Sequence, residues 1–274
     1  CRFRLMHVHT SVRSISQMRF LLLRFHFCEI THTNEMKLVC PKSTRKTRLH
    51  VACFKNRLKE IRALLNNGWD PNTRTVDGKT PLYFCQSNSA MRILLNAGSN
   101  PNVRDRDRNS PLCFALKCWK MTSLLINAGA NCNVSIDING NTPLHHFAKT
   151  EYSLSMVNAL LKAGAKVNKK NRMQHTPLRY ACMSGDVKII ETLLKAGAKV
   201  DETDKDGNTS LMIVCERYHY ENRLRIVKTL FQYGACINAM NRCRYTPLHF
   251  ICRLMGTQSI DVVEFLLNSG ANSN

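Results

Sequence analysis

Apolar and polar residues follow one pattern that recurs seven times along the chain. Each copy opens with Thr or Ser, continues with an apolar series at helical spacing, and closes with Gly. In the fifth copy the apolar series is Val187, Ile189, Ile190, Leu193 and Leu194, a spacing that places these side chains on one helix face. The openings are Thr47, Thr80, Ser110, Thr142, Thr176, Thr209 and Thr246, and the closings are Gly68, Gly98, Gly129, Gly164, Gly197, Gly234 and Gly270. A period of about 33 residues predicts a solenoid of stacked repeats.

Each repeat predicts two helices joined by a tight turn. The best-preserved openings read Thr142-Pro143-Leu144-His145 and Thr246-Pro247-Leu248-His249. Thr caps a helix N-terminus, Pro suits the first helical position, and Gly suits the left-handed turn that ends a helix. From closing Gly to next opening the distance is 12 residues in five of six cases, so the connecting fingers are expected to share one geometry. Length variation falls inside the repeats, which are short near Asn88 and Lys117 and long near 218–220 and 255–257.

The repeated unit resembles the ankyrin repeat. The resemblance is carried by these openings, by the Leu pairs from Leu64-Leu65 to Leu266-Leu267, and by endings such as Gly129-Ala130-Asn131-Cys132-Asn133. The resemblance implies an all-α ankyrin-repeat solenoid of helix-turn-helix units with short β-hairpin fingers. It covers residues 43–274 as seven repeats, the last truncated, so the array is expected to continue beyond Asn274. Residues 1–42 do not follow the pattern and are expected to be a disordered or non-native extension, with Met36 nearer a natural start. The resemblance also implies that Asn72, Asn102, Asn133, Asn168 and Asn238 match a finger position that can be hydroxylated.

The composition limits the classes of partner and the cellular compartments that suit this protein. The formal charge is +21, of which residues 1–46 supply +7, so most of the positive charge lies in the repeats and favours acidic partners. The apolar run 20–27 is too short for a bilayer span. Thirteen Cys is an odd number, and Cys53, Cys182, Cys215 and Cys252 each lie six residues after an opening. Small buried thiols at a repeat position indicate a reducing compartment, which we expect to be the cytoplasm, or the nucleus if the basic run 42–48 is an import signal.

Basic residues on three fingers are the main candidates for partner binding. Arg offers bidentate contact to carboxylates, and repetition of the unit is expected to align the fingers as a positive stripe. The alternative is that they are solvated loops. Trp69 is either an exposed anchor or packs over a neighbouring finger, whereas Trp119 is predicted to fill the core. The candidate residues are Arg104, Arg106 and Arg108; Lys169, Lys170 and Arg172; Arg242, Arg244 and Tyr245; and Trp69.

No catalytic motif is found in the sequence, so we expect a protein without enzymatic activity, cofactor or metal. Within the resemblance, His50, His145 and His249 occupy a position that joins helix starts to fingers by hydrogen bonds. The spacings of Cys113 with Cys118 and of Cys236 with Cys243 do not fit the usual zinc motifs.

The predicted function is a monomeric scaffold or adaptor without a membrane span. It is expected to bind an acidic protein through finger tips and inner helices, in one version as the recognition part of a ubiquitin-ligase adaptor. An alternative is a latrotoxin-like secreted toxin that acts at membranes, which a secretion signal would favour. A third is nucleic-acid binding by charge alone, which weak binding that collapses with salt would reveal.

Overall fold

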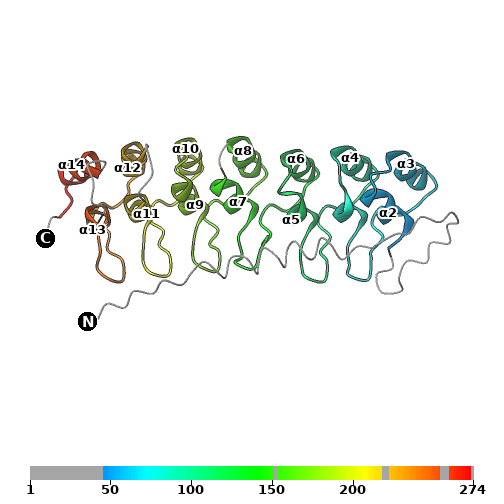
Figure 1. Cartoon of the computed structure of the whole chain (residues 1–274), viewed down its shortest axis with the longest axis horizontal. Coiled ribbons are helices and arrows are strands. Elements are labelled where there is room, and N and C mark those ends of the chain that lie inside the picture. Colours follow the sequence, from blue (N-terminus) through cyan, green and yellow to red (C-terminus); the bar gives the residue numbers. More distant parts are fainter. Residues whose placement is uncertain (1–45, 151–152, 218–221, 254–258, 273–274) are drawn as a thin grey trace. The chain divides into compact units, whose positions relative to one another are not determined.

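The computed structural model describes residues 46–150, 153–217, 222–253 and 259–272, which belong to one compact unit. Within this unit the helices follow one another in pairs (Figure 1). The first helices of the pairs are α2 (Arg48–Phe54), the 3₁₀ turn η1 (Pro81–Phe84), α5 (Pro111–Ala115), α7 (Pro143–Lys149), α9 (Pro177–Ser184), α11 (Ser210–Glu216) and α13 (Pro247–Cys252). The second helices are α3 (Leu58–Asn66), α4 (Asn88–Asn96), α6 (Trp119–Asn127), α8 (Leu154–Lys162), α10 (Val187–Lys195), α12 (Arg223–Gln232) and α14 (Ile260–Asn268).

The pairs stack into two rows, with the first helices in an inner row and the second helices in an outer row. A finger loop leaves each outer helix from α3 to α12, extends past the inner row and returns to the next inner helix (Figure 1). The fingers are numbered here in chain order: finger 1 (69–79), finger 2 (99–109), finger 3 (130–141), finger 4 (165–175), finger 5 (198–208) and finger 6 (235–245). This arrangement confirms the predicted all-α solenoid.

The helix ends fall where the local chemistry predicts. Thr176 Oγ1 accepts a hydrogen bond from the backbone N–H of Arg179 at 3.4 Å, and Pro177 occupies the first turn of α9. The partner helix α10 ends before Gly197, whose φ of +86° lies in the left-handed region that favours glycine.

The core is a ribbon of leucines that belong to two repeat positions. Leu at the second residue after the opening is buried in the first six repeats, and Leu at the fourth residue before the closing Gly is buried in all seven. Each such side chain contributes about 1.5–3 kcal/mol relative to leaving it exposed. Because these side chains pack between neighbouring pairs, each repeat is stabilised by the ones beside it.

The short repeats lose length at their first helices, since η1 and α5 hold only four and five residues. The expected long segments at 218–220 and 255–257 lie outside the described residues, as does the extension at 1–42. No described residue is assigned to a strand, so the fingers are tight loops here and not regular β-hairpins. Two short-range backbone bonds close each finger tip, in finger 2 from Asp105 N–H to Asn109 O and from Arg108 N–H to Asp105 O, each at 3.0 Å.

Candidate functional site

In the first, second, fourth and fifth repeats the third residue after the opening holds the next finger in place. In the first and fourth repeats this residue is a histidine, whose Nδ1 accepts hydrogen bonds from the opening Thr. The Nε2–H of His50 donates to Lys79 O at 3.1 Å, and that of His145 donates to His175 O at 3.0 Å. Burial lowers the pKa of both imidazoles, and the Nδ1 acceptor role requires the neutral form. The structural role expected for these two histidines is therefore present, while His249, within the described residues, bonds only its own Thr246.

In other repeats different side chains at this position link the inner helix to a finger. Tyr83 donates its hydroxyl toward Val103 O and Asn109 O, each at 2.6 Å, and burial raises the pKa of this phenol. Arg179 forms a 2.7 Å ion pair with Asp204 on finger 5, and both side chains are largely buried, at 11% and 5% exposed. These contacts fix the fingers to the inner helices before any partner arrives.

A ladder of asparagines joins the finger bases. Asn102 donates Nδ2–H to Gly129 O at 2.9 Å and accepts from Asn131 N–H at 2.7 Å, and the same pair of bonds is made by Asn72, Asn133, Asn168 and Asn238. The equivalent residue in finger 5 is Asp201, whose carboxylate accepts from Cys236 N–H but has no proton to donate. Hydroxylation of these asparagines stays a prediction.

A backbone hydrogen bond joins the tips of adjacent fingers in three pairs. Arg106 N–H donates to Asp77 O at 2.9 Å, Arg172 N–H to Asn139 O at 2.8 Å, and Arg242 N–H to Asp206 O at 3.0 Å. Fingers 1 and 2, 3 and 4, and 5 and 6 are thereby joined, and among the described fingers no other neighbours share this bond. The accepting finger has Gly at its tip, and at Gly207 a Cβ would lie 3.0 Å from Arg242 N, so close approach excludes a side chain.

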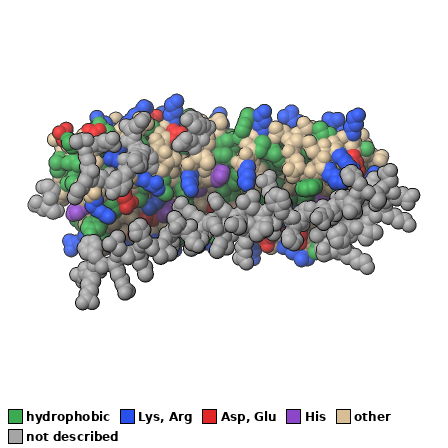
Figure 2. Space-filling model, viewed as in Figure 1, with side chains coloured by type: hydrophobic (Ala, Val, Ile, Leu, Met, Phe, Trp, Pro, Cys, Tyr) green, Lys and Arg blue, Asp and Glu red, His purple; other side chains and the backbone are tan. Residues whose placement is uncertain are grey.

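The predicted basic residues lie on the second finger of each pair. Fingers 2, 4 and 6 carry a net positive charge, whereas finger 1 is neutral and fingers 3 and 5 are net negative. The stripe expected from the sequence is thus divided into three basic tips. Seven of the eight basic candidates are exposed and form no salt bridge within the described residues: Arg104, Arg106, Arg108, Lys169, Arg172, Arg242 and Arg244. Lys and Arg side chains also follow the upper edge of the view, over the outer helices (Figure 2).

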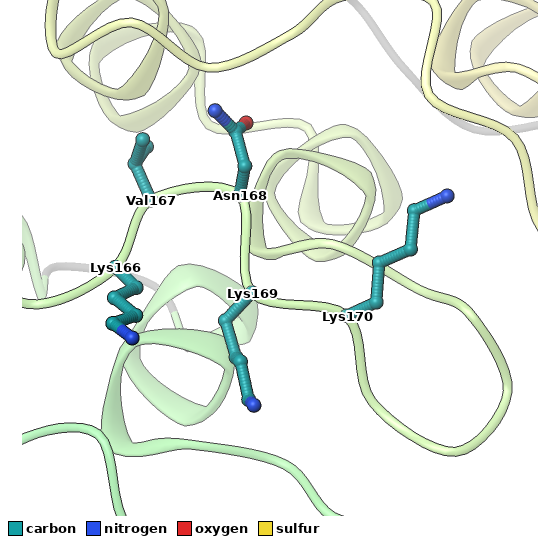
Figure 3. A pocket seen from close by; sticks show the side chains of 5 residues that line it. All are labelled: Lys166, Val167, Asn168, Lys169 and Lys170. Carbon is teal, nitrogen blue, oxygen red and sulfur yellow. The ribbon is translucent and has the colours of Figure 1, made fainter.

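Finger 4 carries the highest positive charge and borders an open hollow of about 550 Å³. Lys166 and Lys169 extend from the finger in the same direction, while Lys170 points the other way (Figure 3). Lys170 Nζ lies 2.6 Å from Glu202 Oε2, so this side chain links finger 4 to finger 5 and is less available to a partner than its neighbours. Lys166 was missed by sequence reasoning, although its place at the finger base is visible in the repeat.

A row of aromatic rings on the inner helices was also missed. Phe84, Phe114, His146 and Tyr180 occupy the fourth residue after the opening in four consecutive repeats, and this constant offset was the available signal. Phe114 is 50% exposed and the others are half-buried. Lys79 Nζ lies 5.5 Å from the centre of the Phe114 ring, which places a cation over the face of an exposed aromatic ring.

The remaining aromatic candidates differ from one another. Trp69 is 39% exposed, and Tyr245 is 44% exposed with its ring 5.6 Å from that of His249. Trp119 was expected in the core, and that prediction is wrong: it begins α6, is 60% exposed, and lies under Lys120 Nζ at 5.5 Å.

The thiols at the repeat position are largely buried. Cys53, Cys182 and Cys215 are buried as expected, and burial raises the pKa of Cys182 and of Cys215 to about 12. Cys252 is exposed, contrary to the pattern. Among the described residues no three His, Cys, Asp or Glu side chains gather in a group that would hold a metal ion.

A family model described as ankyrin repeats (3 copies) matches residues 8–105, 85–171, 112–204 and 178–274. The chain belongs to the ankyrin repeat family. A solved structure that it resembles is the human ASB11 ankyrin repeat domain, with a TM-score of 0.63 and 20% sequence identity over 84% of this chain and 100% of that chain. At this identity the likeness shows the shared fold alone.

Ankyrin repeats indicate a scaffold for protein–protein interaction, and proteins built from them are generally not catalysts. In the part of this ankyrin array that the structure describes, every helix is too short or too polar to cross a bilayer.

Proposed function

We propose that this ankyrin array is a monomeric adaptor that captures an acidic protein segment across the tips of fingers 2, 4 and 6. The observation that supports the proposal most strongly is the set of exposed Arg and Lys side chains on these tips that have no acidic partner within the described residues. Unpaired guanidinium groups bind carboxylates bidentately, and a positive surface also speeds the approach of an acidic partner.

The inner helices supply the apolar part of the same surface. The aromatic row of Phe84, Phe114, His146 and Tyr180 lies on the inner helices, from which the fingers extend. A segment that places carboxylates against the finger tips and apolar side chains toward this row would use both chemistries, since aromatic residues are frequent binding hot spots.

The proposal includes a compartment and a pathway. Buried free thiols suit a reducing compartment, so we place the protein in the cytoplasm or nucleus. We further propose that capture delivers the partner to a ubiquitin ligase. Partner ubiquitylation in a reconstituted ligase reaction that depends on this chain is the readout for that step.

The direct test uses charge reversal at the finger tips. The variant Arg104→Glu, Arg106→Glu, Lys169→Glu, Arg172→Glu leaves Lys170 in place, because its ion pair with Glu202 joins two fingers. Fluorescence anisotropy with a labelled Glu-rich peptide is expected to show at least about a 100-fold weaker affinity for this variant at low salt.

The matched control reverses four exposed outer-helix charges, Lys59, Arg62, Arg92 and Lys188, which form no salt bridge within the described residues. It changes the net charge equally and is expected to retain most of the affinity. Equal loss in both variants would show that binding follows net charge and not the fingers. Circular dichroism must show that both variants remain folded.

A further inference from the structure

We propose that the array recognises an acidic segment at every second repeat, so that its partner carries three acidic clusters about five to six residues apart in an extended chain. This inference rests on the proposed function and adds the spacing of the acidic groups. The structural basis is an alternation with a two-repeat period, which no single repeat contains.

The first element of the alternation is the pairing of finger tips. Arg106, Arg172 and Arg242 stand at one position, the fourth residue before the next opening, and all three are exposed. Each donates its backbone N–H to the finger before it, at 2.8–3.0 Å. Each arginine is therefore held by its main chain while its guanidinium stays available, which reduces the entropy lost on binding.

The second element is the backbone conformation at the tips. The second residue before each opening has positive φ in all six fingers, and it is glycine in fingers 1, 3 and 5. In fingers 2, 4 and 6 the same position holds Arg108 (φ +64°), Gln174 (φ +62°) and Arg244 (φ +64°). A long side chain in this conformation costs stability, and such strain is often kept at functional positions.

The third element is charge between the basic tips. Finger 3 carries Asp137 alone as a charged residue, and finger 5 exposes Asp201 and Asp206, while its other acids Glu202 and Asp204 are paired with Lys170 and Arg179. A partner with evenly spread negative charge meets these exposed carboxylates between the basic tips, whereas a partner with separated clusters avoids them. Nucleic acid has one phosphate for about every 3.4 Å of each strand, so the alternation favours a peptide with spaced carboxylates.

The spacing follows from the stacking distance. Packed helices lie about 8–10 Å apart, so basic tips two repeats apart are separated by about 16–20 Å. An extended chain advances about 3.3 Å per residue, which corresponds to about five to six residues between acidic clusters.

The experiment compares three labelled peptides of about 22 residues with equal length and composition. Each carries three Glu-Glu pairs in a Gly/Ser background, with the pairs repeated every three, six or nine residues. Fluorescence anisotropy against the whole chain is expected to give at least about tenfold tighter binding for the six-residue spacing.

Two triple variants decide whether the fingers cause this preference. The finger triple is expected to lose the preference for the six-residue spacing; it combines Arg106→Gln, Arg172→Gln and Arg242→Gln. The control triple on the outer helices is expected to keep this preference; it combines Arg62→Gln, Arg92→Gln and Lys188→Gln. Both triples remove three charges, and thermal unfolding shows whether each is folded.

The outcomes separate the two proposals. If all three peptides bind equally and the finger triple weakens them equally, the spacing is wrong and the acidic-partner proposal stands. If no acidic peptide binds at low salt, the acidic-partner proposal itself falls. If single-stranded RNA of equal charge displaces the six-spaced peptide as well as that peptide displaces itself, the surface recognises polyanions in general and both proposals are overturned.

Discussion

At the scale of single residues, neutral imidazoles tie one repeat to the next. His145 is buried, accepts from Thr142 through Nδ1 and donates to His175 O through Nε2, so a proton on Nδ1 would remove an acceptor at this joint. The pKa values of His50, His145, His146 and His175 are all lowered, chiefly by burial.

This predicts a loss of stability in mild acid. Below about pH 6.5 the unfolded chain takes up protons on these histidines while the folded chain does not, so the free energy of unfolding falls as the pH drops from about 6.5 toward the lowered folded pKa values. Urea denaturation at several pH values between about 7.5 and 5 measures the slope. His145→Gln is expected to be less stable by about 1 kcal/mol at neutral pH but to decline less in acid. A wild-type stability that stays constant across this range would contradict the neutral-imidazole account.

The tip residues allow a second prediction at this scale. Arg108 has a left-handed backbone conformation, which costs a residue with a side chain about 1–2 kcal/mol. Arg108→Gly removes this cost, while the greater flexibility of glycine in the unfolded chain costs about 0.5–1 kcal/mol. We expect a gain of about 0.5–1 kcal/mol in the free energy of unfolding, together with weaker binding of the acidic peptide. Gly207→Ala is the opposite control and is expected to destabilise the array, because its Cβ would meet Arg242 N at 3.0 Å. An Arg108→Gly variant that is less stable than the wild type would refute the strain argument.

At the scale of elements, one finger base departs from the asparagine ladder. The Asp201 carboxylate accepts a hydrogen bond from Cys236 N–H at 3.1 Å. It cannot donate to the carbonyl of Gly234, whereas the asparagine at the other finger bases donates to the equivalent carbonyl. Its negative charge also lies near the C-terminal end of α12, which is unfavourable for the helix dipole. We predict that Asp201→Asn raises the free energy of unfolding by about 1 kcal/mol, because it adds the missing bond and removes a carboxylate from a helix C-terminus. Asn168→Asp is the reciprocal variant and should lose about the same amount. Chemical denaturation measures the free energy of unfolding of both variants. If both substitutions change this free energy in the same direction, the missing hydrogen bond at Asp201 does not explain the effect.

The ion pair between α9 and finger 5 is a second inter-repeat element. Asp204 accepts backbone N–H bonds from Asp206 and Asn208 and also faces Arg179 at 2.7 Å. Arg179→Met is expected to destabilise the array by about 3 kcal/mol, because it leaves a buried carboxylate without its cation. Adding Asp204→Asn should restore part of this loss, which a double-mutant cycle by urea denaturation measures. If the double variant is no more stable than Arg179→Met alone, the loss does not come from the unpaired charge.

The helix pairs could be predicted from the sequence because their signals are local. Thr176, Pro177 and Gly197 act on the few residues beside them, and their chemistry fixes where a helix begins and ends. The pairing of finger tips and the contact between Lys170 and Glu202 join residues about 30 positions apart, so no local pattern contains them. The exposure of Trp119 depends on how α6 packs in the stack, which spacing alone does not specify.

At the scale of the whole molecule, positive charge lies on two surfaces, and only one is proposed to bind. The outer helices α3 to α12 each carry exposed Lys or Arg, while the finger row concentrates its charge on alternate tips. Because exposed charges are screened over about 8–10 Å at ordinary ionic strength, the partner's affinity is expected to fall steeply with salt. Titration of the six-spaced peptide from about 50 to 300 mM salt measures this, and an affinity unchanged across the range would argue against carboxylate recognition.

Hydrogen–deuterium exchange of the chain with and without the six-spaced acidic peptide shows which surface the peptide covers. We expect slower exchange at the backbone amides of fingers 2, 4 and 6, with the outer helices α3, α4, α10 and α12 unchanged. Protection centred on the outer helices, or spread evenly over all six fingers, would contradict this expectation.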